Sequence, residues 1–474
     1  MMSITSVYSS LRRPAPSGDE RALSRFAYEP LAGQPGHVPW LLRFTAFSIF
    51  FFPSSMVVDV IGAAGTVPMI AACLLLAFWV ASWLWRLHDP VPLRFPGRIA
   101  AVAFFLAIAG SYIALNGGWV GHVEETALAA ADRWMILVAA SAGLILVAGD
   151  SIRTMGDALQ LVRWLLAGAF FCSLVGLIQF VAHVNPMDWM QTVMVGFTYN
   201  GGDTPFQQRG NLVRVAGSTF HSIEFAVVSA MLLPLSIWRA QYDPRGKRWF
   251  HWVQTAMLVF AVASTVSRSG TLGAAVALAV YIPFLARPVR RIVLMVLPVV
   301  VVALFISVPG FLGTLTGALT ADSSDPSLMT RTNNYPRVMR LIDEHPWFGL
   351  GPGNYVPANA LQILDNQYLN SAVSIGLIGL ALMVVYLCLP ALSAILAARA
   401  AQSTAMRSLA GATAAGLAVA AVCSATFDSL SFPVFALLFP LLVGLSGGVW
   451  KMVQAEALDG HFRSGPREPH SQGE

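Results

Sequence analysis

The chain has 474 residues, of which 56% are hydrophobic and only 11% are charged, and its mean hydropathy is +0.65. This composition lies outside the range of soluble globular proteins and predicts an all-α polytopic integral membrane protein. The formal net charge of +5 is small for this length, so the distribution of basic residues is more informative than their sum, and we expect no nucleic-acid partner.

The chain begins with a polar segment, residues 1–39, that holds four arginines among Ser, Pro and Gly. This segment lacks the apolar core and the small-residue cleavage site of a signal peptide, and its composition is typical of a disordered tail. Residues 454–474 at the other end have the same character. We therefore expect one transmembrane domain, residues 40–453, between two cytoplasmic tails.

Between the tails, twelve segments are apolar enough to cross a bilayer as helices, each of which needs about 20 residues. Their starts lie near Trp40, Val67, Arg98, Trp134, Arg163, His221, Trp252, Ser269, Arg291, Asn370, Arg407 and Leu430. Residues 54–66 could extend the first span or re-enter the membrane, and the seventh and eighth segments follow each other closely. The sequence therefore predicts about 12 transmembrane helices, with eleven or thirteen left open.

The basic residues predict which side of the membrane each connection faces. With the N-terminus inside, 21 of the 29 Lys and Arg residues fall on the cytoplasmic side and seven on the outer side, while Arg43 lies within the first span. Both termini are then cytoplasmic, and the two long connections, about 184–220 and 310–369, are extracytoplasmic. Loops of this length are often functional. The aromatic and amide residues of the first loop could stack on a sugar and hydrogen-bond to it. The alternative is a solvated loop with an aromatic belt at the membrane interface, which has the same composition.

The first long loop leads into the sixth span through RVAGSTFHSIEFAVV, which places His221 and Glu224 three residues apart on one helical face. This pair could transfer a proton, with Glu224 holding the His221 ring in one tautomer. Helix capping is the alternative. Two ligands do not make a metal site, so we expect no metal.

Arginines on the outer side are candidates to bind a diphosphate, because the planar guanidinium binds phosphate oxygens in pairs. Those in or beside the long loops and the turn before the eighth span are Arg209, Arg214, Arg268, Arg331, Arg337 and Arg340. Arg268 is the sharpest case, since it lies where two hydrophobic segments meet, a position that indicates function. The alternative to a functional role is that the Arg268 side chain extends to the lipid headgroups of the outer leaflet.

The polar stretch 331–370 combines a short helix with a glycine run. Pro336 is expected to open the helix and Pro346 to end it, which gives an amphipathic helix at 336–344 that could lie on a membrane surface. Three glycines between 349 and 353 follow, and they supply backbone that can turn tightly or approach a ligand closely.

Three segments together resemble the O-antigen ligase and polymerase superfamily. They are the serine-arginine turn at 267–270, Arg331 leading into PRVMRLIDEHPWFGLGPGNY, and DNQYLNSAVSIGLIGL, within roughly residues 213–385. The resemblance implies an extracytoplasmic membrane glycosyltransferase that takes a glycan from undecaprenyl diphosphate and joins it to a glycan, lipid-linked or protein acceptor. It also implies that Arg268 and Arg331 bind the diphosphate. Further substrate-binding candidates are Arg214, Arg337, Arg340, Asn354 and Asn366.

One departure from the family pattern concerns the residues before the tenth span. Ligases carry a His-Asn pair there, whereas this chain has Asp365 and Asn366, and this difference favours a polymerase. Asp365 is then the preferred base for the acceptor hydroxyl, with Asn366 beside it to fix the acceptor. His221 is the second candidate, because its intrinsic proton affinity suits neutral pH. Helix capping by Asp365 is the alternative to catalysis.

The sequence therefore predicts a metal-independent enzyme without cofactor in the bacterial cytoplasmic membrane. It would polymerise or transfer lipid-linked oligosaccharide at the outer face in surface polysaccharide biosynthesis. A ligase of the same superfamily, for O-antigen or protein glycan, is the alternative. So is a transporter or flippase of lipid-linked sugars, which would show repeat symmetry and broken helices at the midplane; neither is apparent in the sequence.

Overall fold

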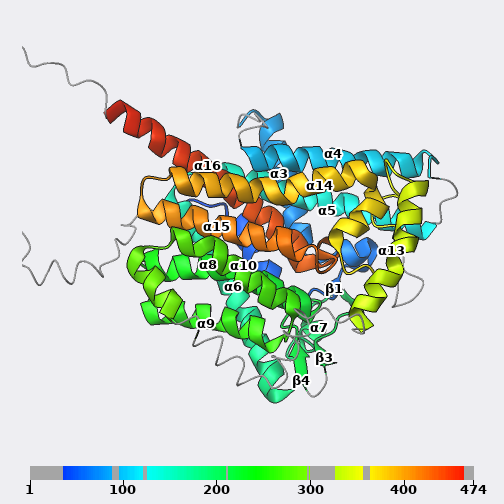
Figure 1. Cartoon of the computed structure of the whole chain (residues 1–474), viewed down its shortest axis with the longest axis horizontal. Coiled ribbons are helices and arrows are strands. Elements are labelled where there is room, and N and C mark those ends of the chain that lie inside the picture. The colour runs from blue at the N-terminus through cyan, green and yellow to red at the C-terminus, as the bar shows by residue number, and fades with distance from the viewer. Residues whose placement is uncertain are drawn as a thin grey trace, which may run out of the picture.

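The chain folds into a bundle of long helices, with two pairs of short strands at one end (Figure 1). The computed structural model describes residues 36–87, 95–120, 125–209, 212–295, 298, 326–355 and 363–463. Most of the predicted N-terminal tail, the end of the C-terminal tail, most of the ninth span beyond Met295 and the loop residues 310–325 lie outside the described residues.

The helices follow the apolar segments of the sequence. In chain order they are α2 (Trp40–Phe51), α3 (Val67–Leu84), α4 (Pro96–Asn116), α5 (Glu125–Ser151), α6 (Met155–Ala182), α7 (Met190–Val193), α8 (Ser222–Tyr242), α9 (Arg248–Ser264), α10 (Arg268–Tyr281), α13 (Pro326–Glu344), α14 (Gln367–Ala400), α15 (Thr404–Cys423) and α16 (Pro433–Arg463). Single turns of tighter helix are η2 (Asp59–Ala64), η3 (Ile282–Phe284) and η5 (Ser429–Ser431).

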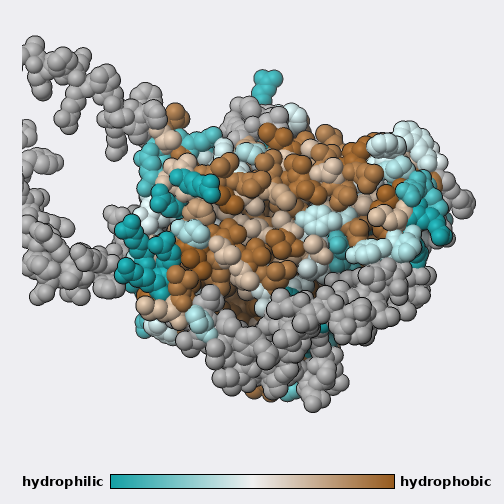
Figure 2. Space-filling view, viewed as in Figure 1, coloured by the Kyte–Doolittle hydropathy of each residue, from teal (hydrophilic) through white to brown (hydrophobic). Residues whose placement is uncertain are grey.

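Each predicted span start falls within or beside a helix, which confirms an all-α polytopic membrane fold. Eight of the described helices are long and apolar enough to cross a membrane, and α2 and the segment Arg268–Phe284 are shorter apolar helices. The count of twelve spans stays a prediction. In Figure 2 hydrophobic side chains form a broad band across the middle of the bundle, and hydrophilic ones gather toward its two ends.

The short strands join segments that are far apart in the sequence. Strand β1 (Met56–Val57) pairs antiparallel with β2 (Thr198–Tyr199), and β3 (Phe206–Arg209) pairs antiparallel with β4 (Leu212–Val215). Residues 54–66 therefore do not extend the helix of the first span, and their re-entry into the membrane stays a prediction. They hold β1 and η2 and bind the first long loop.

Helices α8 and α16 lie at the centre of the bundle. In their membrane-spanning windows α8 buries 94% of its residues and α16 89%, whereas the peripheral α3 buries 28%. Small residues allow the close packing: a Cβ at Gly416 of α15 would lie 2.6 Å from the carbonyl oxygen of Met231 in α8, and one at Gly270 of α10 2.3 Å from the Ala226 Cβ. Such residues let the backbones of membrane helices approach one another.

Helix α13 differs from the prediction at its start and in its partner. It begins at Pro326, and Pro336, expected to open it, lies inside it. Its apolar face packs against the protein, since Val338 is 1% exposed and clusters with Leu364 and Val373. A proline inside a helix removes one backbone hydrogen bond, and burial of this face can offset that cost.

Helix α14 is broken at Gly376, where φ is +73°, a break that is not apparent in the sequence. The segment after α13 fills the break: the Leu350 N–H donates to the Val373 carbonyl at 2.9 Å, and the Leu377 N–H donates to the Pro346 carbonyl at 2.8 Å. The backbone groups freed by the break are thereby satisfied inside the protein.

The glycine run allows the segment after α13 to pack closely against the break in α14. Gly349, Gly351 and Gly353 all have positive φ, and a Cβ at Gly349 would lie 2.5 Å from backbone atoms of α14. The structure shows the tight turn that the sequence allowed, packed on the broken helix. A close approach of this backbone to a ligand stays a prediction.

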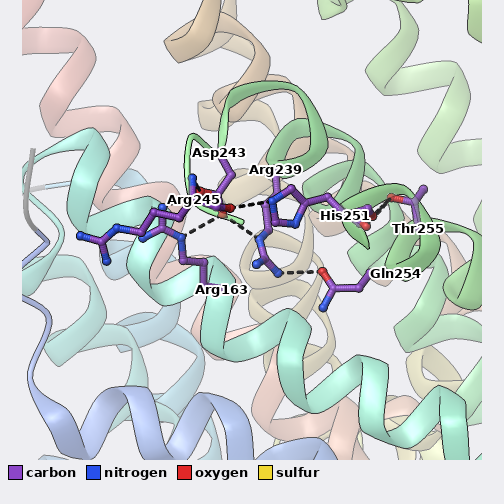
Figure 3. Close-up of polar contacts among 8 residues, drawn as sticks. Arg163, Arg239, Asp243, Arg245, His251, Gln254 and Thr255 are labelled. Carbon is purple, nitrogen blue, oxygen red and sulfur yellow. Dashed lines mark hydrogen bonds and ion pairs between the residues drawn. The ribbon is translucent and has the colours of Figure 1, made fainter. Parts of the chain in front are cut away.

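At the opposite end of the bundle an ion-pair network ties α6 to the turn between α8 and α9 (Figure 3). The buried Asp243 carboxylate accepts from Arg163 at 2.5 and 2.9 Å and from Arg239 at 3.0 Å, and Arg239 also donates to Gln254 at 2.8 Å. Although burial opposes ionisation, the two guanidinium groups hold the pKa of Asp243 below its usual value.

Candidate functional site

One end of the bundle collects the starts of four helices and most of the predicted site residues. Helices α8, α10, α14 and α16 all begin there, at Ser222, Arg268, Gln367 and Pro433. A helix N-terminus presents unpaired N–H groups and the positive end of the helix dipole. This end therefore favours an anionic ligand.

The turn between α9 and α10 positions Arg268. Ser267 caps α10, and Arg268 is the first, half-buried residue of the helix. Val266 just before has a φ of +46°, which a β-branched residue rarely adopts and which costs about 1–3 kcal/mol. Arg214 of β4 donates through Nε to the Thr265 carbonyl at 2.7 Å, so this second predicted arginine lies at the same turn.

His221 caps the start of α8, the alternative that the sequence left open. Its Nδ1 accepts from the Ile223 N–H at 3.0 Å, and its Nε2 lies 3.0 Å from the side-chain amide of Gln207. Burial and the nearby Arg214 charge lower the pKa of His221 to about 4, because both disfavour a second proton on the ring. The ring is thus neutral at pH 7 with both nitrogens engaged, and its assignment as a base stays a prediction.

Glu224 does not hold the His221 ring as predicted. The fully buried carboxylate accepts from the backbone N–H groups of Phe220 at 2.9 Å, Val434 at 2.7 Å and Phe435 at 3.1 Å. The reason is that α16 begins beside it, and the first N–H groups of a helix have no partner within the helix. Glu224 therefore joins two helix starts, and its catalytic assignment stays a prediction.

Asp365 and Asn366 have separate tasks at the start of α14. The Asn366 Oδ1 accepts from the Tyr368 N–H at 2.9 Å and from the next N–H at 3.3 Å, so Asn366 is the cap. Capping, the alternative predicted for Asp365, thus belongs to its neighbour. Asp365 is exposed and lines a cavity of about 90 Å³ together with Asn334 and Tyr335 of α13.

A second acidic residue, Asp428, lies close enough to Asp365 for the two carboxylates to interact electrostatically. Burial and the Asp365 carboxylate raise the pKa of Asp428 to about 6, against the opposing effect of hydrogen bonds from Ser431 and Asn370. Its Oδ1 is shielded from solvent and has no hydrogen-bond partner among the described residues. Asp428 is not among the residues predicted from the sequence, although an ionisable residue between two apolar spans is the same signal that singled out Arg268.

The remaining candidates lie around α13 and the glycine run. The Arg337 guanidinium stands 5.9 Å from the centre of the Tyr355 ring, and Arg340 is exposed. Asn354 donates to the Leu350 carbonyl at 3.4 Å within the glycine-rich turn. Arg331 lies in α13, but its side chain is outside the described part of the structure.

Comparison with known proteins supports the family resemblance of one segment. Residues 253–384 match the family model described as O-Antigen ligase, while no curated protein matches the chain. The matched segment includes Arg268, Arg337 and Asp365, whereas His221 and Asp428 lie outside it. The match covers less than a third of the chain. It supports the resemblance to the O-antigen ligase superfamily, and the apolar helices are those of a multi-pass membrane protein.

Proposed function

We propose that the protein is a metal-independent glycosyltransferase of the bacterial cytoplasmic membrane that polymerises oligosaccharide units carried on undecaprenyl diphosphate. The candidate site would face away from the cytoplasm, where such lipid-linked units are presented. The family match supports a lipid-linked glycan donor and an acceptor in a membrane. The carrier, the face and the preference for polymerisation over ligation are our proposal.

The observation that carries this proposal is the placement of Arg268 and Asp365 at neighbouring helix starts. Two consecutive residues at the end of α15 bridge them: the Cys423 thiol donates to the Ser269 carbonyl at 3.4 Å, and the Gln367 N–H donates to the Ser424 carbonyl at 2.9 Å. A fixed cation and a carboxylate therefore stand at one end of the bundle. These are the groups that transfer from a diphosphate carrier requires.

In the proposed reaction, an acceptor hydroxyl oxygen forms a bond to the anomeric carbon of the donor while the bond from that carbon to the diphosphate oxygen breaks. The hydroxyl proton passes to Asp365, and the leaving diphosphate keeps the electron pair. Pre-placed cations and helix N-termini stabilise the charge that develops on that leaving group. Arg268, with Arg214 at the same turn, would supply the cations.

Polymerase activity is preferred because a carboxylate occupies the position at which the resembled ligases carry histidine. Asp365 is exposed beside a cavity, so it can meet an incoming hydroxyl. Asp428 next to it shares the local negative charge, and a proton taken up by one carboxylate would be stabilised by the other.

The test uses purified full-length protein in lipid nanodiscs with a synthetic undecaprenyl-diphosphate oligosaccharide. Longer glycans from this donor alone are the expected result for a polymerase. Products that form only after lipid A core is added would identify a ligase and overturn the preference. Arg399→Ala, an exposed arginine at the opposite end, is the matched control for Arg268→Ala and should retain the wild-type rate.

If neither mixture yields a transferred glycan, the proposed transfer reaction is wrong. Labelled donor that crosses the bilayer of sealed vesicles without elongation would instead assign the protein to the transporter alternative.

A further inference from the structure

A cavity of about 1140 Å³ lies at the end of the bundle opposite the candidate site. It opens between the start of α2, the end of α3, the junction of α5 and α6, and the last turns of α16. The proposed glycosyl transfer uses none of these residues. One half of the cavity wall is apolar and the other half carries charges.

The apolar half is formed by side chains of three helices, some buried and some exposed. Leu75 and Phe78 of α3, Trp40 of α2 and Val147 of α5 line it. Trp40 is 68% exposed and Phe78 is 62% exposed, and α3 is the least buried of the candidate membrane spans. Such large exposed apolar side chains on a spanning helix are positions that lipid chains cover.

The charged half is built around Asp150 at the end of α5. Its carboxylate lies 3.0 Å from the Arg98 Nη2 and 3.5 Å from the Lys451 Nζ, and it accepts from the Trp79 Nε1 at 3.1 Å. Arg98 is only 2% exposed, whereas Lys451 is 25% exposed and lines the cavity. Two cations thus share one carboxylate.

A third cation lies at the same place. Arg153 lines the cavity, and its Nε donates to the Asp150 backbone carbonyl at 3.1 Å. A second carboxylate in the cavity wall, Asp157, accepts from the N–H groups of His37, Arg153 and Thr154 and from the Thr154 hydroxyl at 2.7–3.2 Å, as part of the cap of α6. Among the residues that the structure describes, three cations therefore face two carboxylates, and one of these, Asp157, is engaged with donors that precede α6.

From this arrangement we propose a binding site for an anionic glycerophospholipid of the leaflet opposite the candidate site. The headgroup phosphate lies by Lys451 and Arg153, and the acyl chains run along Leu75, Phe78 and Val147. An anionic lipid matches both halves, because basic pockets between spanning helices bind acidic headgroups. A zwitterionic lipid lacks the net charge, and a free phosphate leaves the apolar wall unused.

The experiment measures lipid binding to delipidated full-length protein in detergent by native mass spectrometry. The probes are dioleoyl phosphatidylglycerol, dioleoyl phosphatidylethanolamine and soluble glycerol phosphate. Phosphatidylglycerol should bind more tightly than phosphatidylethanolamine, and Arg153→Gln and Lys451→Gln should each weaken it about five-fold. Arg407→Gln, which removes an exposed cation at the same end but outside the cavity, is the matched control and should bind as the wild type does.

A volume variant keeps the test independent of the ion pairs. Val147→Phe leaves every charge in place and fills part of the apolar half, so it too should weaken phosphatidylglycerol binding. Equal binding of both lipids, an unchanged affinity in Arg153→Gln and Val147→Phe, or displacement of phosphatidylglycerol by glycerol phosphate would each overturn the proposal. The last result would assign the cavity to a water-soluble phosphate.

Discussion

At the scale of single residues, the candidate site separates groups that hold helix ends from groups left to meet a substrate. Asn366 caps α14, His221 caps α8 and Glu224 joins the starts of α8 and α16. Arg268 and Asp365 each stand beside a residue that already does the capping. The predictions for single residues follow from this division.

Arg268→Lys is expected to lose nearly as much donor affinity as Arg268→Ala, about 10- to 100-fold, because a lysine keeps the charge but not the paired donors. Turnover and donor binding are measured separately in membranes with matched protein levels. Full activity in Arg268→Ala would remove this residue from the mechanism, and wild-type affinity in Arg268→Lys would show that charge alone suffices.

Asp365→Asn should lower glycan transfer by about 10²- to 10⁴-fold, the usual contribution of a general base, while donor binding survives. Asn366 remains as the cap, so the fold should be unaffected. His221→Gln should slow transfer less, because the wild-type ring is neutral and engaged on both sides. If Asp365→Asn extends glycan at the normal rate and His221→Gln does not, the base is His221.

Asp428→Asn should raise thermal stability at pH 7.5 while lowering transfer. The pKa of Asp428 is raised from 3.8 to about 6 in the folded protein. At pH values above 6 its charged form therefore lowers the stability of the folded state, and the neutral Asn removes this cost. Well below pH 3.8 the carboxyl is protonated in both folded and unfolded chains, and variant and wild type should then unfold at the same temperature. The difference should grow as pH rises from 4 to 6. Thermal unfolding in detergent across this range measures it, and equal stability at pH 7.5 would contradict the argument.

At the scale of elements, the broken α14 and the turn at 346–350 behave as one unit. The turn supplies a carbonyl and an N–H to the break, and Gly376 and Gly349 leave room for the two backbones to meet. The start of α14, which carries Asp365, is therefore positioned by a segment that follows α13.

Gly349→Ala should destabilise the protein more than Gly118→Ala. Both glycines have positive φ, +67° and +71°, so both variants bear the strain of about 1–2 kcal/mol for a side chain in that conformation. Only at Gly349 would the new Cβ also meet backbone, 2.5 Å away, whereas nothing lies within 4 Å at Gly118. The difference in thermal stability between the two variants measures the effect of the Gly349 contact. Equal losses of stability would show that the turn moves away from the new Cβ without destabilising the protein.

At the scale of the whole molecule, the bundle has two polar ends with different contents. One end has the four helix starts with Arg268 and Asp365, and the other has the Asp243 network and the large cavity. Which end faces the cytoplasm is a prediction from the basic residues.

Cysteine labelling tests this orientation. Glu344→Cys at the end of α13 should react with a membrane-impermeant thiol reagent in intact spheroplasts, whereas Gln402→Cys, beyond the other end of α14, should react only after lysis. The native cysteines are buried or half-buried, so the unmodified protein serves as the background. The reverse pattern of labelling would invert the topology.

The sequence predicts the positions of the spanning helices because long apolar runs have few alternatives in a membrane. It could not predict the break at Gly376, since the turn that satisfies it comes from another part of the chain. The start of α13 was missed for a similar reason, because burial of Val338 outweighs the usual preference of Pro336 for a first turn. Arg268 and Asp365 were found through motif position, whereas the proximity of Asp428 to Asp365 requires the fold.

The Glu224 contact also constrains the order in which the protein can be completed. Its carboxylate is separated from Val434 by 210 residues, so during synthesis α8 enters the membrane long before its partner exists. At about 5–20 residues per second, the ribosome needs roughly 10 to 40 s to make the intervening chain. Until α16 is made, the Glu224 carboxylate must be solvated by water, neutralised by a proton or bound by the insertion machinery. The last helix therefore closes the assembly, and a chain truncated before it should be recognised as unfinished and degraded.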